Sequence, residues 1–226
     1  MAVFGCGPVG QFAIASAKLM GAGRVVAIDT VPDRLNMARD QQAETIDFNQ
    51  EDPVDAIQRL TGGIGADCVI DAVGVDAVAP RSGPAVKQMT EQERQAEARQ
   101  LNQNAPQTNP QNGNWIPGDA PSQVLEWAVK VARKGGKLSI IGVYPETQKT
   151  FPIGPAMNKN LRLNMGNCNH RKYVPHLLDL VQSGTIVPEH ILTKQEPIIS
   201  AIEAYKAFDT RQPGWLKVEL EPAAVH

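Results

Sequence analysis

Three glycines near the start of the chain are spaced as in a loop that binds phosphate. They lie in the run Gly5-Cys6-Gly7-Pro8-Val9-Gly10, a G-x-G-x-x-G pattern that is weak evidence alone because glycines also mark ordinary turns. In a dinucleotide site, Gly5 allows a tight turn, Gly7 leaves room for the pyrophosphate, and Gly10 lets the following helix pack on the strand. The free N–H groups and positive dipole end of that helix would then receive the phosphates.

The context that this pattern needs is also present. An apolar segment, 2–4, precedes the glycines, a helical pattern follows them, and Asp29 ends the next apolar run, 19 residues past Gly10. A carboxylate there would accept hydrogen bonds from both hydroxyls of the adenosine ribose and would repel a 2′-phosphate. The sequence therefore predicts NAD as the cofactor in preference to NADP. The alternative is a glycine turn with a solvated aspartate after a strand.

The elements around these residues alternate between strand and helix. Short apolar runs predict strands at 2–4, 24–28, 44–47, 67–72, 137–143 and 161–165. Helical patterns predict helices at 11–20, 33–40, 53–60 and from Ser122, as the cap, to Arg133, with a stop at Gly135-Gly136. Such alternation implies parallel pairing with right-handed crossovers. We predict an α/β fold: a Rossmann doubly wound parallel sheet of order 3-2-1-4-5-6.

An insertion at about 76–121 interrupts this alternation. From Thr90 onward it is rich in Gln, Asn and Pro, with little to bury. Its Thr90-Glu91-Gln92-Glu93 run is a capping-box pattern, which predicts one polar helix over 94–101. The remainder reads as a long surface loop. We interpret the segment as an insertion that the fold tolerates; a lid or a subunit contact is the alternative.

Composition narrows the classes of partner and location. The 226 residues carry a formal net charge of −2, with no run of about five or six like charges, which argues against nucleic acid and acidic membrane surfaces as partners. No apolar stretch is long enough to span a bilayer. The three cysteines lie far apart without a C-x-x-C pair, which is typical of a reducing compartment and predicts a cytoplasmic location. Small molecules are the expected partners.

Several runs together resemble one known family. They are 3–29, Pro32-Asp33-Arg34-Leu35, 67–74, and Gly135-Gly136-Lys137-Leu138 with Ile141-Gly142-Val143. These runs resemble the cofactor half of medium-chain, zinc-dependent type alcohol dehydrogenases, and look closest to the branch that includes formaldehyde, sorbitol and threonine dehydrogenases. The resemblance covers most of the chain except the insertion.

The resemblance assigns roles to residues by position. It implies that Val9 packs behind the nicotinamide, Arg34 reaches the adenosine ribose, Val73 lies along the cofactor, and the backbone at 141–143 meets the carboxamide. A homo-oligomer formed through the Rossmann domain is a further expectation. The full expected cofactor-binding set is Gly5, Gly7, Pro8, Val9, Gly10, Asp29, Arg34, Val73, Gly74, Ile141, Gly142 and Val143.

The resemblance also implies two parts. Residues 1–166 would form the NAD-binding Rossmann domain, and 167–226 would rejoin a catalytic domain, with helices near 173–182 and 198–208 and a last strand at 216–220. The family's catalytic zinc ligands and its four-cysteine structural zinc lobe lie upstream of the glycine loop, and that sequence is not present here. The N-terminal catalytic domain is therefore expected to be missing.

The expected chemistry follows from the lack of those zinc-binding segments in this sequence. Cys168, His170 and His176 fit no zinc pattern, so we expect no catalytic and no metal-binding residue in this chain and zinc only in a full-length family enzyme. The predicted function is the NAD-binding portion of an oxidoreductase that moves a hydride between an alcohol or aldehyde and NAD, inactive alone. The alternative is a non-catalytic NAD-binding module or accessory subunit.

Overall fold

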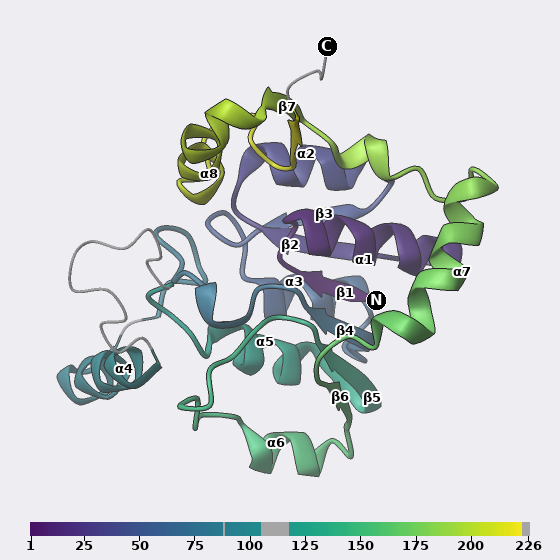
Figure 1. The fold of residues 1–226 in the computed structure, drawn as a ribbon. Coiled ribbons are helices and arrows are strands. Elements are labelled where there is room, and N and C mark those ends of the chain that lie inside the picture. Colours follow the sequence, from purple (N-terminus) through teal and green to yellow (C-terminus); the bar gives the residue numbers. More distant parts are fainter. Residues whose placement is uncertain (88, 105–117, 223–226) are drawn as a thin grey trace. The chain divides into compact units, whose positions relative to one another are not determined.

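Six parallel strands form the sheet of the first unit, Met1–Gly166, in a computed structural model that describes residues 1–87, 89–104 and 118–222 (Figure 1). The strands are β1 Ala2–Phe4, β2 Val26–Asp29, β3 Glu44–Asp47, β4 Ala66–Asp71, β5 Ala132–Ile140 and β6 Arg162–Met165. Their order is β3-β2-β1-β4-β5-β6, and every neighbouring pair is parallel. This confirms the predicted Rossmann fold and strand order. The order reverses between β1 and β4, where such sheets bind ligands.

Helices cover both faces of this sheet. Helices α1 (Pro8–Leu19) and α2 (Pro32–Asp40) lie on one face, and α3 (Pro53–Leu60) and α5 (Gln123–Val131) lie on the other (Figure 1). Successive side chains of a strand point to opposite faces, so Val3 joins the core beneath α1 and α2 while Phe4 joins the core beneath α3 and α5. The ring of Phe4 stacks on Trp127, with centroids 6.1 Å apart.

The predicted boundary between α5 and β5 is wrong. Helix α5 ends at Val131 and β5 begins at Ala132, so Gly135 and Gly136 lie within the strand instead of ending the helix. Ala132 pairs with Ala66 and Lys137 with Cys68, so residues 133–136 lie opposite Asp67 alone and bulge out of the ladder. Glycines mark such a bulge as readily as a helix end.

Smaller differences concern the ends of other elements. Helix α1 begins at Pro8, three residues before its predicted start, because proline is suited to the first helical position. Ser122 is the N-cap residue of α5 but makes no side-chain capping bond. A short helix, α6 (Ile153–Asn158), lies between β5 and β6, where no helix was predicted.

The insertion after β4 has both packed and exposed parts. A single turn, η1 (Gly74–Asp76), follows the strand, and α4 (Glu91–Asn104) is the polar helix, longer than predicted. The capping box is confirmed: the Glu93 N–H donates to Thr90 Oγ1 (3.3 Å) and the Thr90 N–H donates to Glu93 Oε2 (2.7 Å). The Thr90 N–H and the Thr90 hydroxyl both donate to Glu93 Oε2, and these two bonds lower the pKa of Glu93. Within the predicted surface loop, residues 105–117 lie outside the described residues.

The two ends of this insertion meet at one place beside β4. The Ala120 N–H donates to the Ala77 carbonyl (3.0 Å), and the Ala79 N–H donates to Asp119 Oδ1 (2.9 Å). Arg81 forms an ion pair with Asp119 at 2.7 Å. A Cβ atom on Gly118 would lie only 1.9 Å from the Ala77 carbonyl oxygen. These contacts define what we call the stem of the insertion.

The second unit, Asn167–His226, contains two main helices and a small sheet. Its elements are α7 His170–Gln182, η2 Pro188–Ile191, β7 Lys194–Pro197, η3 Ile198–Ser200, α8 Ala201–Asp209 and β8 Val218–Glu221. Both helices were predicted with slightly different bounds. Strand β8 pairs in parallel with β7, which was not predicted.

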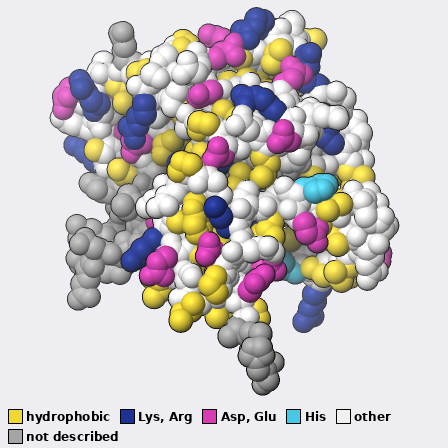
Figure 2. Space-filling model, turned by 90° about the horizontal axis from the view of Figure 1, so that it is seen from above, with side chains coloured by type: hydrophobic (Ala, Val, Ile, Leu, Met, Phe, Trp, Pro, Cys, Tyr) yellow, Lys and Arg dark blue, Asp and Glu magenta, His cyan; other side chains and the backbone are white. Residues whose placement is uncertain are grey.

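Two properties of the described residues concern contact with membranes and with charged partners: the composition of the helices and the distribution of charge on the surface. None of the helices in the described part of the chain combines the length and apolar composition that crossing a bilayer requires. The face drawn in Figure 2 carries Lys and Arg side chains interspersed with Asp and Glu.

Candidate cofactor site

The glycine loop is held between β1 and α1 by close backbone contacts. At Gly5 the φ angle is +86°, a conformation that L side chains rarely adopt, and the Gly5 N–H donates to the Ile28 carbonyl at 2.8 Å. A Cβ atom on Gly10 would lie 1.8 Å from the Gly5 carbonyl oxygen. The structure therefore admits only glycine at position 10 without a shift of α1 away from β1.

The N-terminus of α1 opens toward this loop. Gly7 is the N-cap residue and supplies no side chain, and Pro8 occupies the first turn. Around a Cβ atom on Gly7 the nearest atoms are those of the Arg34 guanidinium, 3.8 Å away. The side chain of Val9, on the same turn, is 51% exposed. An approaching group would meet backbone N–H groups here with little steric hindrance.

The carboxylate of Asp29 lies beside this loop at the end of β2. Its Oδ2 accepts the Cys6 N–H (2.7 Å), and its Oδ1 accepts the N–H groups of Thr30 (2.7 Å) and Val31 (2.9 Å). Arg34 Nη1 lies 3.9 Å from Oδ2. A carboxylate has about four acceptor positions, so three backbone donors fix its orientation and leave capacity for a ligand hydroxyl.

Gln11 supports the loop from beneath, a role that sequence reasoning missed. The side chain is fully buried, and its Nε2 donates to the carbonyls of Cys6 (2.8 Å) and Arg34 (2.9 Å). It therefore joins the glycine loop to α2. A polar residue on the inward face of an otherwise apolar helix was the available signal. Burial, with a smaller contribution from Asp29, raises the pKa of the Cys6 thiol well above its usual range.

The loops after β4 and β5 meet at the same edge of the sheet. The Val75 N–H donates to the Val143 carbonyl (2.9 Å). Gly74 has a φ of +74°, and a Cβ atom there would lie 2.5 Å from both N and O of Val143. Beside this contact the side chains of Ile141 and Val143 are 50% and 77% exposed. The crossing thus presents backbone and apolar side chains to solvent.

Asp71 and Tyr144 join these two loops, and neither was predicted as a site residue. Asp71 is fully buried at the end of β4, and its Oδ2 accepts the Tyr144 hydroxyl at 2.7 Å. Burial, and then the neighbouring Asp71, raise the pKa of Tyr144 above its usual range. An acid at the end of the apolar run Val69-Ile70 was the signal in the sequence.

These two groups of residues form one continuous edge. Val73 connects them, because a Cβ atom on Gly5 would lie 2.6 Å from Val73 Cγ2. The structure therefore brings every predicted cofactor-binding residue to the ends of β1, β2, β4 and β5. Metal ligands are a different matter: within residues 1–87, 89–104 and 118–222, no three His, Cys, Asp or Glu side chains gather as a metal site.

In comparisons with known proteins, the chain is similar to dehydrogenases. A family model described as zinc-binding dehydrogenase matches residues 8–88. A zinc-type alcohol dehydrogenase-like protein of Bacillus subtilis (strain 168) is 32% identical over 222 residues, which cover 97% of this chain and 52% of that protein. An L-threonine 3-dehydrogenase of Bacillus velezensis is 46% identical over 74 residues, covering 32% of this chain and 21% of that protein.

Solved structures extend the likeness to the fold. The alcohol dehydrogenase from Thermus sp. ATN1 is 29% identical and superposes with a TM-score of 0.73, over 98% of this chain and 51% of that one. The chain spans about half the length of these full-chain relatives. Sequence and fold therefore agree that the chain is similar to the cofactor-binding half of zinc-type alcohol dehydrogenases.

Proposed function

We propose that this chain binds NAD at the edge formed by the ends of β1, β2, β4 and β5, as the NAD-binding portion of an alcohol dehydrogenase-type oxidoreductase. The observation that carries the proposal is the carboxylate of Asp29, held by three backbone N–H groups beside a loop that leads into the N-terminus of α1. This is the arrangement that a ribose and its adjoining pyrophosphate require.

The adenosine half of NAD would bind between Asp29 and the glycine loop. Asp29 accepts a hydrogen bond from a ribose hydroxyl at its remaining acceptor position, and Arg34, whose guanidinium lies near both Asp29 and Gly7, contacts the same ribose. The N–H groups at the start of α1, near Pro8, receive the pyrophosphate. Gly7 keeps that approach open because it has no side chain.

The nicotinamide half would bind over the crossing of the loops after β4 and β5. The exposed side chain of Val9 packs behind the ring, Val73 and Gly74 lie along the cofactor, and the backbone from Ile141 to Val143 meets the carboxamide. When bound, NAD supplies the acceptor for a hydride from the substrate. This chain's residues orient the ring that receives it.

We assign oxidation of an alcohol, or reduction of an aldehyde, to a longer family enzyme and not to this chain alone. Zinc does not fit the described residues, which bring no three ligands together, so no step through a metal is assigned to this chain. We propose that the chain alone does not turn over alcohols. Assays of NADH formation with primary and secondary alcohols, with and without zinc, test this; turnover that a chelator abolishes would refute it.

The arrangement of Asp29 beside the glycine loop also favours a second candidate function, a non-catalytic NAD-binding module or accessory subunit. Such a module would bind NAD with the same residues and would be inactive under every condition. Co-expression with a zinc-binding half from a relative separates the two: recovered alcohol oxidation supports the dehydrogenase, and tight NAD binding without recovered activity supports the module.

Cofactor choice tests the site directly. A 2′-phosphate about 4 Å from Asp29 would be repelled by about 4 kcal/mol at an effective dielectric near 20, and Arg34 offsets part of this. We expect NADH to bind at least about tenfold more tightly than NADPH in fluorescence titrations, a difference of about 1.4 kcal/mol.

Two matched variants identify the carboxylate as the cause. Asp29→Asn should narrow the gap between NADH and NADPH because it removes the charge and keeps an acceptor oxygen. Asp40→Asn, the same change at an exposed position at the end of α2, should leave the gap unchanged. Equal affinities of wild type for both nucleotides would refute the role of Asp29.

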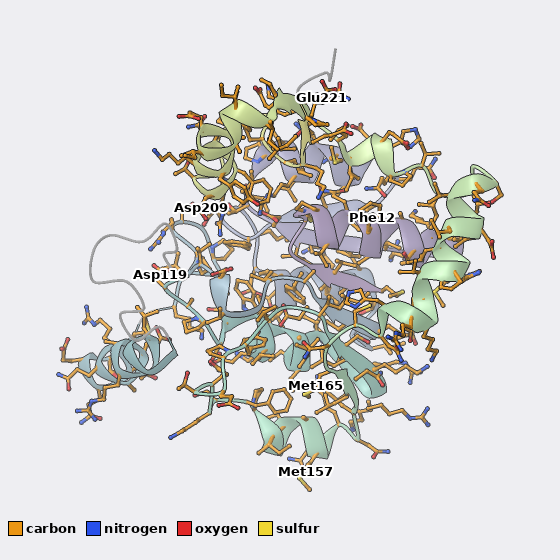
Figure 3. The ribbon with its side chains drawn as sticks, viewed as in Figure 1. Phe12, Asp119, Met157, Met165, Asp209 and Glu221 are labelled. Atoms are coloured by element: carbon orange, nitrogen blue, oxygen red, sulfur yellow. The ribbon has the colours of Figure 1, made fainter. Side chains whose placement is uncertain are left out.

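We also propose a homo-oligomer formed through the Rossmann domain. Strand β6 is an edge strand, and Met157 on α6 and Met165 at the end of β6 are 74% and 64% exposed (Figure 3). An edge strand with exposed methionines beside it offers a surface for pairing. Sedimentation analysis of wild type and Met165→Lys tests it, and a monomeric wild type at high concentration would contradict it.

The cytoplasm is the location that we propose for the chain. The support is that Cys6, Cys68 and Cys168 are free thiols, as expected in a reducing compartment. Fluorescence microscopy of a tagged chain in its native cell tests this location.

A further inference from the structure

Asp71 collects hydrogen bonds from both loops that meet at the nicotinamide end of the edge. Its Oδ1 accepts the N–H groups of Val73 (2.9 Å) and Gly74 (3.0 Å), from the loop after β4. Its backbone carbonyl accepts the N–H groups of Ile141 and Gly142 (2.9 Å each), from the loop after β5. One fully buried residue thus sets the backbone of both loops.

Tyr144 completes this arrangement from the loop after β5. Its hydroxyl donates to Asp71 Oδ2 at 2.7 Å, so it gives the second carboxylate oxygen a donor. A buried carboxylate oxygen without a donor is costly. Without the tyrosine hydroxyl, the structure must either admit water to the pair or move the two loops apart.

The space between the loops leaves little tolerance for such a movement. A Cβ atom on Gly142 would lie 2.2 Å from the Gly74 nitrogen, so the two backbones are in direct contact. The Val75 N–H to Val143 carbonyl bond, at 2.9 Å, lies next to that contact. A small shift of either loop would therefore change the backbone that faces solvent at Ile141 to Val143.

We infer that Tyr144 and Asp71 are positioning residues for the nicotinamide half of the dinucleotide. They act through the backbone of the two loops and do not touch the cofactor. The inference rests on the proposed NAD site. The pair is remote from the adenosine determinants, because Asp71 ends β4 and Asp29 ends β2, with β1 between these strands.

The test compares two ligands that share the adenosine half. NADH and ADP-ribose are titrated calorimetrically against the full chain as wild type, Tyr144→Phe and Tyr205→Phe. Tyr205→Phe is the matched control because it removes the same hydroxyl from an exposed residue of α8. We expect Tyr144→Phe to weaken NADH binding at least fivefold while ADP-ribose binding stays within twofold, and the control to change neither.

Each other outcome has a definite meaning. Unchanged NADH affinity in Tyr144→Phe overturns the inference, and so does an equal loss of both ligands, which would show a general structural role. Wild type that binds NADH no more tightly than ADP-ribose overturns it as well, because nicotinamide would then add nothing. Wild type that binds neither ligand overturns the proposed NAD site itself.

A measurement on wild type keeps the inference testable if the variant does not fold. Hydrogen exchange of the Gly74 and Gly142 amides is followed by NMR with no ligand, ADP-ribose or NADH. We expect NADH alone to slow the exchange of these two amides. Equal slowing by both ligands, or by neither, overturns the inference.

Discussion

Adding one methyl group at Gly10 should damage both the stability of the chain and its NAD site. In Gly10→Ala the new Cβ would lie 1.8 Å from the Gly5 carbonyl oxygen and 2.8 Å from the Gly5 carbonyl carbon. Both atoms are backbone, so neither can rotate away. Normal van der Waals contact requires a separation of about 3.5 Å, so α1 and the loop must move apart by about 1.7 Å.

The cost of this movement can be estimated from what α1 buries. Ala13, Ile14 and Ala17 of α1 are buried against the sheet, and moving the helix outward loosens all three. Overpacking in a well-packed core costs about 1–3 kcal/mol, and a rigid backbone obstacle favours the upper end. Replacing glycine by alanine in a helix returns about 1 kcal/mol. We expect a net destabilisation of about 2 kcal/mol.

Urea unfolding and NADH titration together measure the effect. With a slope of about 2 kcal/mol per molar urea, Gly10→Ala should unfold at about 1 M less urea, and NADH binding should be lost in the folded protein because the start of α1 has moved. Gly23→Ala is the control, since nothing lies within 4 Å of its Cβ position. An unfolding midpoint and NADH affinity equal to wild type in Gly10→Ala would refute this account of the loop.

Three further predictions concern other parts of the chain. Because the pKa of Tyr144 is raised in the folded chain, the stabilisation that its hydroxyl contributes is present below the unfolded tyrosine pKa of about 10 and is lost as pH rises above that value. Wild type should therefore lose more stability than Tyr144→Phe between about pH 9 and 11, the range where tyrosine ionises. Urea unfolding at several pH values measures this difference. Iodoacetamide should label the exposed Cys168 first and the buried Cys6 last, as read by mass spectrometry; fast labelling of Cys6 in the native state would contradict its burial. Gly154→Ala, in α6 with nothing within 4 Å, should raise the free energy of unfolding by about 0.5–1 kcal/mol, and a lower value would show a contact not expected there.

The strands and their order could be read from the sequence because parallel strands buried on both faces appear as short apolar runs. The runs that became β1 and β3 have the predicted bounds, and the glycine loop leads from β1 into the first turn of α1. Gly135-Gly136 was misread because a helix end and a strand bulge have the same local signal. Only the pairing of Ala132 with Ala66 and of Lys137 with Cys68 distinguishes them, and that pairing is a long-range property.

The polar contacts of the candidate site were harder to predict than its glycines. A glycine is required by its own backbone conformation and nearest packing, so a local motif reports it. The bond between Asp71 and Tyr144 joins residues 73 positions apart, and its existence depends on how the loops after β4 and β5 cross. Gln11 was read as a helix residue, and its bonds to the carbonyls of Cys6 and Arg34 depend likewise on tertiary packing.

The stem of the insertion separates the length of the intervening chain from the geometry of the sheet. Because Ala77 and Ala120 are hydrogen-bonded to each other, the chain leaves the sheet and returns to it at one point, whatever lies between. Doubling the length of a flexible loop costs only about 0.6 kcal/mol in closure entropy. Beyond Ala85, which belongs to the core, and Lys87, which pairs with Glu126 of α5, the segment of α4 can thus be lengthened, shortened or exchanged for a foreign segment while β4 and α5 keep their positions.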